Sequence, residues 1–137
     1  MPVDARGAVA RRALGLVGVP FKLGGRCPRA GLDCVGVVGL ALAGHAPAQR
    51  IPAGYALRGE YLERIAAFFD CASFRPVTRE NTAPGDILLC QPAAHQFHLA
   101  VVTDQGVVHA HAGLRRVVLT PLALPWPIIG HWRLVGD

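Results

Sequence analysis

The chain has 137 residues, of which 52% are hydrophobic and 17% charged, with 14 basic and 9 acidic side chains. At about 100–200 residues per domain, this length predicts one domain over residues 1–137, and the high apolar content excludes a disordered chain. The longest apolar stretches, Val35–Gly44 and Leu119–Gly130, are short or interrupted by proline. No membrane span is therefore expected, because a spanning helix needs about 20 apolar residues.

The basic residues do not indicate a nucleic-acid partner. The net charge is +5, but the arginines are scattered, and only Arg11–Arg12 and Arg115–Arg116 are adjacent. No basic run is interleaved with aromatic residues. A polyanionic partner such as a cell-wall polymer, or simple solubility, accounts for the charge equally well. The N-terminal segment lacks the apolar core of a signal peptide, so synthesis in the cytoplasm is expected.

The first segments of the chain predict a helix and then a loop. Apolar spacing indicates an amphipathic helix over Ala5–Val17, with Asp4 as its N-cap and Gly18 at its end. The segment Pro20–Leu32 is rich in glycine, proline and arginine and is expected to be a loop.

Two further helices are predicted before the chain changes character. A buried helix is expected over Cys34–Ala43, with Asp33 at its start, where a carboxylate suits the helix dipole. Gly36 and Gly39 lower its helix propensity but allow a neighbouring element to approach closely. Apolar residues at helical spacing predict a surface helix over Leu57–Phe69.

The second half of the chain predicts strands. Short β-branched or apolar runs are separated by turn residues, and residues 104–106 and 112–113 are hairpin signals. Helices followed by an antiparallel meander predict an α+β fold, with the helices packed on one side of a sheet of about five strands. The expected strands are Asp86–Cys90, Leu99–Thr103, Val107–Ala110, Arg115–Thr120 and Ile128–Leu134.

Cys34 is the candidate nucleophile of a thiol-dependent reaction. It follows a Gly-Leu-Asp turn and opens the buried helix, where the dipole and unpaired N–H groups are expected to lower the pKa of the thiol. The same N–H groups are placed to donate to a developing oxyanion. The other cysteines form no CxxC pair and are expected to be structural and mostly reduced: Cys27, Cys71 and Cys90.

Two histidines are predicted to meet at one end of a hairpin. His98 begins one expected strand and His109 ends the next. A tight turn at residues 104–106 pairs residues whose numbers sum to about 210, or slightly less with a bulge. Both imidazoles then lie at the same end of adjacent strands, where a base and the residue that orients it must be. His111 competes with His109 for the second role, because both share one face of the strand.

A metal site is the chemical alternative for these residues. His98, His109 and His111 could bind zinc together with Cys34. No carboxylate or second thiol lies near them, so we expect no metal and no cofactor. The remaining histidines are expected to be structural or surface residues: His45, His95 and His131.

Five short motifs follow one another along nearly the whole chain. They are Pro20-Phe-Lys-Leu-Gly-Gly25, Gly31-Leu-Asp-Cys-Val-Gly36, Pro84-Gly-Asp-Ile-Leu88, His98-Leu-Ala-Val-Val102 and Val108-His109-Ala110. In order and separation, they resemble the NlpC/p60 family of cysteine peptidases. The closing runs at 116–122 and 126–133 most resemble the branch found in phage tails and gene-transfer particles.

The resemblance implies a papain-like α+β fold and hydrolysis of a peptide amide in the bacterial cell wall, typically between D-glutamate and a diamino acid. It implies that Cys34 is the nucleophile, His98 the base and His109 the residue that orients the base. Asp33 matches an acidic position that helps to bind the amine end of the stem peptide. The turn at Pro84–Asp86 matches a structural motif.

Two positions depart from the family pattern and affect substrate contacts. Val35 stands where the family often has serine, and Phe21 where it often has tyrosine, so two hydroxyl groups near the expected cleft are lost. These changes, with no attached wall-binding module in view, favour an alternative: a non-enzymatic phage-tail or particle component that keeps the fold. The expected partners are a peptidoglycan stem peptide and phage-tail or gene-transfer-particle proteins acting at the cell wall.

Overall fold

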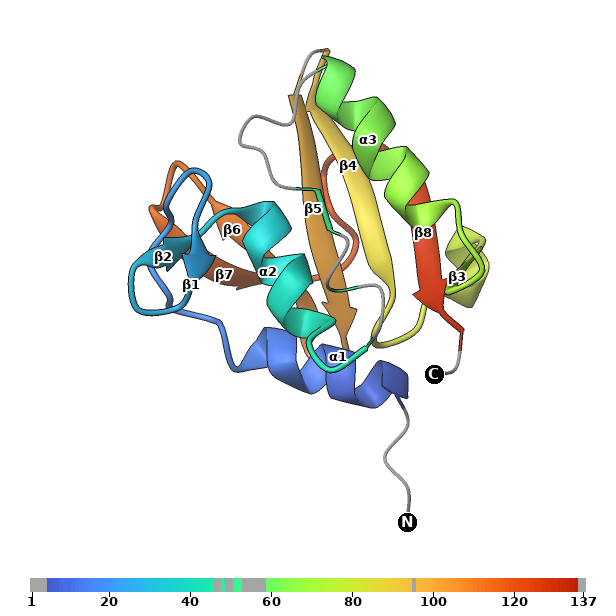
Figure 1. The fold of residues 1–137 in the computed structure, drawn as a ribbon, viewed down its shortest axis with the longest axis horizontal. Coiled ribbons are helices and arrows are strands. Elements are labelled where there is room, and N and C mark those ends of the chain that lie inside the picture. The colour runs from blue at the N-terminus through green and yellow to red at the C-terminus, as the bar shows by residue number, and fades with distance from the viewer. Residues whose placement is uncertain (1–4, 46–47, 49–50, 53–58, 95, 136–137) are drawn as a thin grey trace.

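Six antiparallel strands form the main sheet of the structure, a computed structural model that describes residues 5–45, 48, 51–52, 59–94 and 96–135. The strands are β3 (Phe74–Pro76), β4 (Ile87–Ala93), β5 (Gln96–Thr103), β6 (Gly106–His111), β7 (Arg116–Thr120) and β8 (Ile128–Leu134). Their order across the sheet is β3-β8-β4-β5-β6-β7 (Figure 1). All neighbours are antiparallel, and the predicted meander holds from β4 to β7. The last strand, β8, departs from it, because it pairs with β4 and β3 instead of β7.

The helices of the described residues lie on one face of this sheet (Figure 1). They are α1 (Ala5–Leu14), α2 (Cys34–Ala41) and α3 (Gly59–Phe69). Their apolar side chains, among them Val9, Val38 and Ile65, are fully buried in one cluster that includes Leu99 and Val101 of β5. The predicted α+β architecture, with helices on one side of a sheet, is therefore confirmed. No helix in the described residues is long and apolar enough to cross a membrane.

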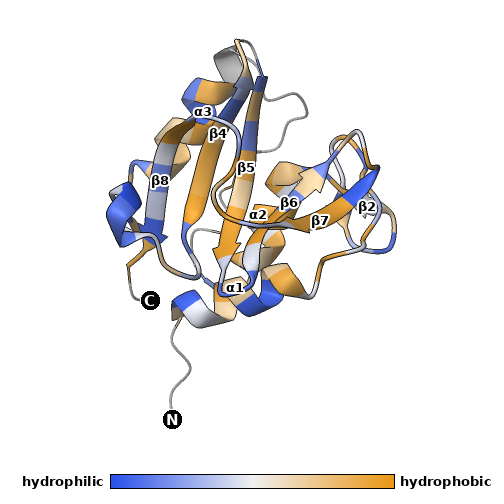
Figure 2. Cartoon of the chain, turned by 180° about the vertical axis from the view of Figure 1, so that it is seen from behind, coloured by the Kyte–Doolittle hydropathy of each residue, from blue (hydrophilic) through white to orange (hydrophobic). Residues whose placement is uncertain are grey.

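The other face of the sheet carries a second, smaller apolar cluster. On β4, Leu89 points to the helices, whereas Leu88 and Cys90 lie in this second cluster with Leu124 and Trp126 of the segment before β8. Both faces of the central strands are thus covered, which explains why the strand sequences are continuous apolar runs. Figure 2 shows this apolar character along β4 and β5.

The first helix is shorter than predicted. It ends at Leu14, whereas the sequence pattern extends over Ala5–Val17, and the predicted cap Asp4 lies outside the described residues. The N–H of Gly18, whose φ is +95°, donates to Val117 O at 2.9 Å. The predicted helix therefore stops short of Val17, because the backbone that follows pairs with β7 at Gly18.

The segment predicted as a loop before α2 contains a small hairpin. Its strands are β1 (Arg26–Cys27) and β2 (Gly31–Leu32), which pair antiparallel beside α2 (Figure 1). The strand β3 and a short 3₁₀ helix, η2 (Arg79–Asn81), were likewise not predicted. Such short elements leave little periodicity in a sequence. The predicted start of the third helix, residues 57–58, lies outside the described residues.

The predicted turn and register between β5 and β6 are confirmed. Val101 pairs with Val108 and Thr103 with Gly106, so the paired numbers sum to 209. Gly106 has a φ of +135°, which favours glycine, and the Thr103 hydroxyl donates to Gly106 O at 2.8 Å. This tight connection fixes which residues of the two strands lie near each other.

Asp86 joins the start of β4 to β8 through a buried ion pair. Its side chain is fully buried and accepts hydrogen bonds from Arg133 Nε at 2.7 Å and from His131 Nε2 at 2.8 Å. It also accepts one from the Ala83 N–H at 3.0 Å. The Arg133 and His131 side chains hold the pKa of Asp86 below its usual value despite burial. These contacts assign the turn at Pro84–Asp86 a structural role, in line with the sequence interpretation.

Replacing this carboxylate is expected to destabilise the protein. Asp86→Ala leaves the Arg133 guanidinium buried without its partner, which costs about 3 kcal/mol or more of unfolding free energy. Urea denaturation of both forms measures the difference. Glu63→Ala, on the exposed side of α3, is the control and is expected to change stability by less than about 0.5 kcal/mol. A small loss for Asp86→Ala would contradict the assigned role.

Candidate active site

Asp33 fixes the start of α2 and thereby the position of Cys34. Its Oδ1 accepts a hydrogen bond from the Gly36 N–H at 2.8 Å, which makes it the N-cap of the helix, as predicted. Oδ1 also accepts from Arg26 Nη1 at 2.8 Å, and Oδ2 accepts from the Gly24 N–H at 2.9 Å. With only 4% of its surface exposed, Asp33 ties the loop before α2 to the helix.

Gly36 permits this close packing. A side chain at this position would collide with the carbonyl oxygen of Gly25, which belongs to the loop that Asp33 binds. The prediction that a neighbouring element approaches the helix closely is therefore confirmed at Gly36. At Gly39, by contrast, a Cβ atom would make an ordinary contact with Ile51.

His98 and His109 meet as the hairpin register predicts. His98 Nε2 lies 2.8 Å from His109 Nδ1, within hydrogen-bond distance, and the two rings are nearly perpendicular. On the far side, His109 Nε2 lies 2.8 Å from the hydroxyl oxygen of Thr120. The indole of Trp126 packs edge-on against both imidazoles, at centroid distances of 5.6 and 5.5 Å. His109, with 1% of its surface exposed, is thus enclosed by protein groups.

His111 makes a different contact. Its Nδ1 accepts a hydrogen bond from the Leu114 N–H at 3.1 Å, in the turn between β6 and β7. Of the two candidates for the residue that orients His98, the structure therefore brings His109 to His98, whereas His111 binds the adjacent turn.

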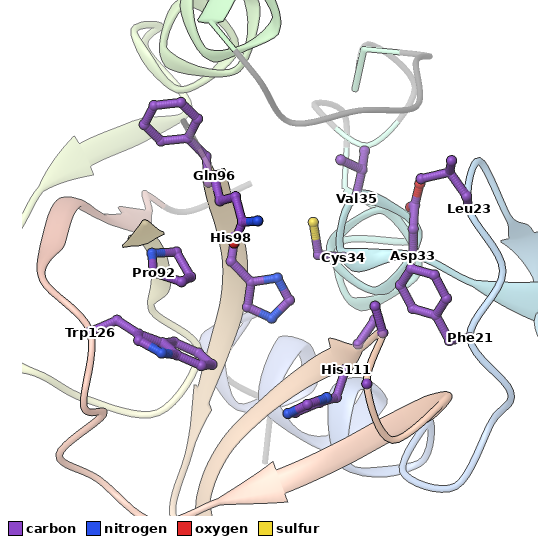
Figure 3. A pocket seen from close by; sticks show the side chains of 14 residues that line it. Phe21, Leu23, Asp33, Cys34, Val35, Pro92, Gln96, His98, His111 and Trp126 are labelled. Carbon is purple, nitrogen blue, oxygen red and sulfur yellow. The ribbon is translucent and has the colours of Figure 1, made fainter. Parts of the chain in front are cut away.

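The strands β5 and β6 separate at the site. Their pairing ends at Val101 and Val108, whereas β5 continues beside β4 and β6 continues beside β7. Alternation along β5 puts His98 on the sheet face opposite α2, with Ala100. The opening between the strands lets its ring reach the side of the sheet where Cys34 lies (Figure 3).

Cys34 and His98 line one cavity of about 440 Å³. Asp33, Phe21 and Val35, the residues predicted to contact substrate, also line it. Figure 3 shows the Cys34 sulfur and the His98 ring in this cavity, with Trp126 on the side of the ring away from Cys34. Because His98 Nε2 contacts His109, Nδ1 is the ring nitrogen left for Cys34. Two other lining residues, Trp126 and Gln96, were not identified from the sequence, and neither was Thr120 behind His109.

The charge state of the site differs from the sequence prediction. Burial raises the pKa of the Cys34 thiol to about 12, and the Asp33 carboxylate adds to this, whereas backbone hydrogen bonding from Leu99 and Val35 opposes it. Burial likewise lowers the pKa of His98 to about 3 and that of His109 to about 4. The expectation of a lowered thiol pKa is wrong for this structure: at neutral pH the thiol and both imidazoles are uncharged. Desolvation outweighs the dipole of an eight-residue helix.

The zinc alternative finds no support in the described residues. His, Cys, Asp and Glu side chains form no group of three there that is arranged to hold a metal ion. His98 Nε2 and both nitrogens of His109 are instead engaged in hydrogen bonds. All four cysteines are free thiols. Of the other histidines, His45 is buried, His131 binds Asp86, and His95 lies outside the described residues.

Several solved structures that resemble this chain carry the name NlpC or p60. The chain superimposes on NlpC1 from Trichomonas vaginalis with a TM-score of 0.73 and 15% identity, covering 100% of this chain and 46% of that one. The chain has the NlpC/p60 fold. It is also similar to the peptidoglycan hydrolase RipB from Mycobacterium tuberculosis, with a TM-score of 0.62, 20% identity and coverage of 97% and 66%.

A third similar structure is described as non-catalytic. RipD from Mycobacterium tuberculosis, named a non-catalytic NlpC/p60 domain protein adapted to peptidoglycan binding, has a TM-score of 0.63, 16% identity and coverage of 98% and 100%. The chain spans less than half the length of the first three structures it matches. No protein-family model and no curated protein sequence matches the chain. The NlpC/p60 fold therefore occurs in both hydrolytic and non-catalytic proteins.

Alkylation of Cys34 in the free protein is expected to be slow at neutral pH. A thiol whose pKa is about 12 is almost entirely protonated at pH 7, and the thiolate is the reactive species. Iodoacetamide labelling followed by peptide mass analysis should show Cys34 reacting more slowly than the exposed Cys27, with a rate that still rises above pH 9. Faster labelling of Cys34 than of Cys27 at pH 6–7 would show a preformed ion pair and contradict the neutral site.

The neutral histidines are also expected to make the protein sensitive to acid. His98 and His109 have pKa values below the ordinary 6.5, so below pH 6.5 the unfolded chain binds more protons than the folded chain. The free energy of unfolding should therefore fall as the pH drops from about 6.5 towards 4. Urea denaturation across this range should give a shallower pH dependence for the double variant His98→Gln/His109→Gln. An equal slope in both proteins would contradict the lowered pKa values.

Proposed function

We propose that the protein is a cysteine peptidase that cleaves an amide bond of the peptidoglycan stem peptide, between D-glutamate and a diamino acid. The observation that carries the proposal is the convergence of Cys34, at the start of α2, and His98 at one cavity, with the enclosed His109 hydrogen-bonded to His98. A thiol, a base and a residue that orients the base are the parts that nucleophilic catalysis needs. The fold, shared with a peptidoglycan hydrolase, supports the choice of substrate class.

The uncharged resting site implies general-base catalysis. His98 Nδ1 takes the proton of the Cys34 thiol as sulfur attacks the scissile carbonyl carbon, rather than holding a thiolate beforehand. The carbonyl double bond opens to an oxyanion as the carbon–sulfur bond forms. When the C–N bond breaks, protonated His98 gives its proton to the leaving amine. Water, deprotonated by His98, then hydrolyses the thioester and releases Cys34.

The first turn of α2 supplies donors for the oxyanion. The Gly36 N–H is used by the Asp33 cap, and the Val37 N–H donates to the Asp33 carbonyl. The N–H groups of Cys34 and Val35 precede these and find no carbonyl acceptor in the described part of the chain. They lie next to the sulfur and are oriented by the helix, so they stabilise negative charge on the tetrahedral intermediate.

Phe21 and Val35 give the cavity an apolar wall beside Cys34. In this proposal they pack against the aliphatic part of the stem peptide, in place of hydrogen bonds that hydroxyl groups would make. Asp33, proposed to bind the amine end of the substrate, already accepts hydrogen bonds from Arg26, Gly24 and Gly36. An amine therefore reaches this carboxylate only in competition with the Arg26 guanidinium.

A non-enzymatic role is the second candidate. The neutral, buried thiol favours it, because a binding protein has no need for an activated nucleophile. RipD, described as non-catalytic and adapted to peptidoglycan binding, has the same fold. Under this candidate the chain is a component of a phage tail or gene-transfer particle that engages the cell wall. The hydrogen-bonded pair His98–His109 next to Cys34 supports the peptidase instead.

Digestion of purified sacculi tests the two candidates directly. The wild-type protein is expected to release stem-peptide fragments cut between D-glutamate and the diamino acid, identified by mass analysis. Cys34→Ala should lower the rate by about 10³-fold or more, whereas His109→Ala should retain a measurable fraction, because the base itself remains. Cys71→Ala, at the end of α3 and outside the cavity, is the matched control and should cut normally.

Two results would contradict the peptidase. One is cutting by Cys34→Ala at the wild-type rate, which would exclude the thioester mechanism. The other is binding of the wild-type protein to sacculi without release of any fragment, which would establish the binding role.

A further inference from the structure

Thr120 lies directly behind the histidine pair. It belongs to β7, where it pairs with Val107, while His109 pairs with Val118 two residues earlier. Alternation therefore puts the side chains of Thr120 and His109 on the same face of the sheet, as diagonal neighbours. The Thr120 hydroxyl oxygen lies 2.8 Å from His109 Nε2. Since His109 is 1% exposed, its Nε2 depends on this protein contact for a hydrogen-bond partner.

His98, His109 and Thr120 form a hydrogen-bonded series. The ring nitrogen that carries the proton in one histidine determines which nitrogen carries it in the other. If His98 Nδ1 is to accept the thiol proton, His98 must carry its own proton on Nε2 and donate it to His109 Nδ1. His109 must then carry its proton on Nε2 and donate it to the Thr120 hydroxyl oxygen. A hydroxyl oxygen has lone pairs to accept this bond. His111 is not part of this hydrogen-bonded series, because its Nδ1 accepts from the Leu114 N–H.

We infer that Thr120 is a positioning residue that selects the tautomers of His109 and His98, so that His98 presents an unprotonated Nδ1 to Cys34. The effect on rate rests on the proposed peptidase function, whereas the effect on the tautomers rests on the hydrogen bonds alone. Thr120 touches neither the thiol nor the scissile bond. It acts through two hydrogen bonds, each 2.8 Å long.

Valine at this position would remove the acceptor and little else. Threonine and valine have nearly the same shape, and both are favoured in strands, so β7 is expected to form in Thr120→Val. A buried Nε2–H on His109 would then have no acceptor, which favours the tautomer with the proton on Nδ1. That proton would be donated to His98 Nε2, and His98 would carry its own proton on Nδ1. In this state His98 cannot accept the thiol proton.

Nitrogen-15 NMR of the full chain, labelled at histidine, reads these tautomers at pH 7 without any substrate. Wild-type protein and Thr120→Ser, which keeps the hydroxyl, are expected to show His98 and His109 both protonated on Nε2. Thr120→Val is expected to shift both to Nδ1. Thr78→Val is the control, because it removes an exposed hydroxyl that accepts from Asn81 Nδ2 and contacts neither histidine, so both tautomers should stay unchanged. Unchanged tautomers in Thr120→Val would overturn the inference.

Stem-peptide hydrolysis gives the second readout. Thr120→Val should lower kcat by about tenfold or more with KM unchanged, and Thr120→Ser should restore kcat to within about threefold of wild type. Equal loss in both variants would show a merely structural role and overturn the inference. If the wild-type protein cuts no substrate, the peptidase proposal fails, while the NMR comparison still decides whether Thr120 selects the tautomers.

Discussion

The end of pairing between β5 and β6 is the constraint on which the site depends. His98 points to the sheet face opposite α2, whereas Cys34 lies on the helix side, so a continuous sheet would separate them. Pairing stops at Val101 and Val108, and each strand remains paired on its outer side. Next to the opening, β5 therefore keeps β4 as its paired neighbour and β6 keeps β7. Thiol and imidazole therefore reach one cavity without a flexible loop carrying either group.

Asp33 positions the nucleophile and also influences its charge. As the N-cap it holds Cys34 in the first turn of α2, and through Arg26 and Gly24 it holds the preceding loop. The same carboxylate disfavours a negative charge on the neighbouring sulfur, although Arg26 opposes it. A helix N-terminus thus organises donors around Cys34 without producing a thiolate in the free protein.

The sequence was sufficient to predict helices and strands with strong apolar periodicity, and side chains whose positions follow from the pairing register of a hairpin. The helices, five of the strands and the meeting of His98 with His109 follow from apolar spacing and one tight turn. The strand β3 and the hairpin β1–β2 are too short to leave a pattern. Trp126 and Thr120 reach the site through tertiary packing that no local pattern shows. The thiol pKa was mispredicted because burial is a property of the folded chain.

The hydrogen-bonded residues His98, His109 and Thr120 bear on the choice between a catalytic and a binding role for the cavity. Enclosing two imidazoles lowers their pKa values, and such groups make the folded state less stable in acid. A cavity that only binds a peptide gains nothing from a hydrogen-bonded series that runs from Thr120 through His109 to the nitrogen beside the sulfur. A base needs that series, because it fixes where the ring keeps its proton and which nitrogen stays free. In the proposed peptidase, the buried pair acts at the step in which a proton leaves Cys34.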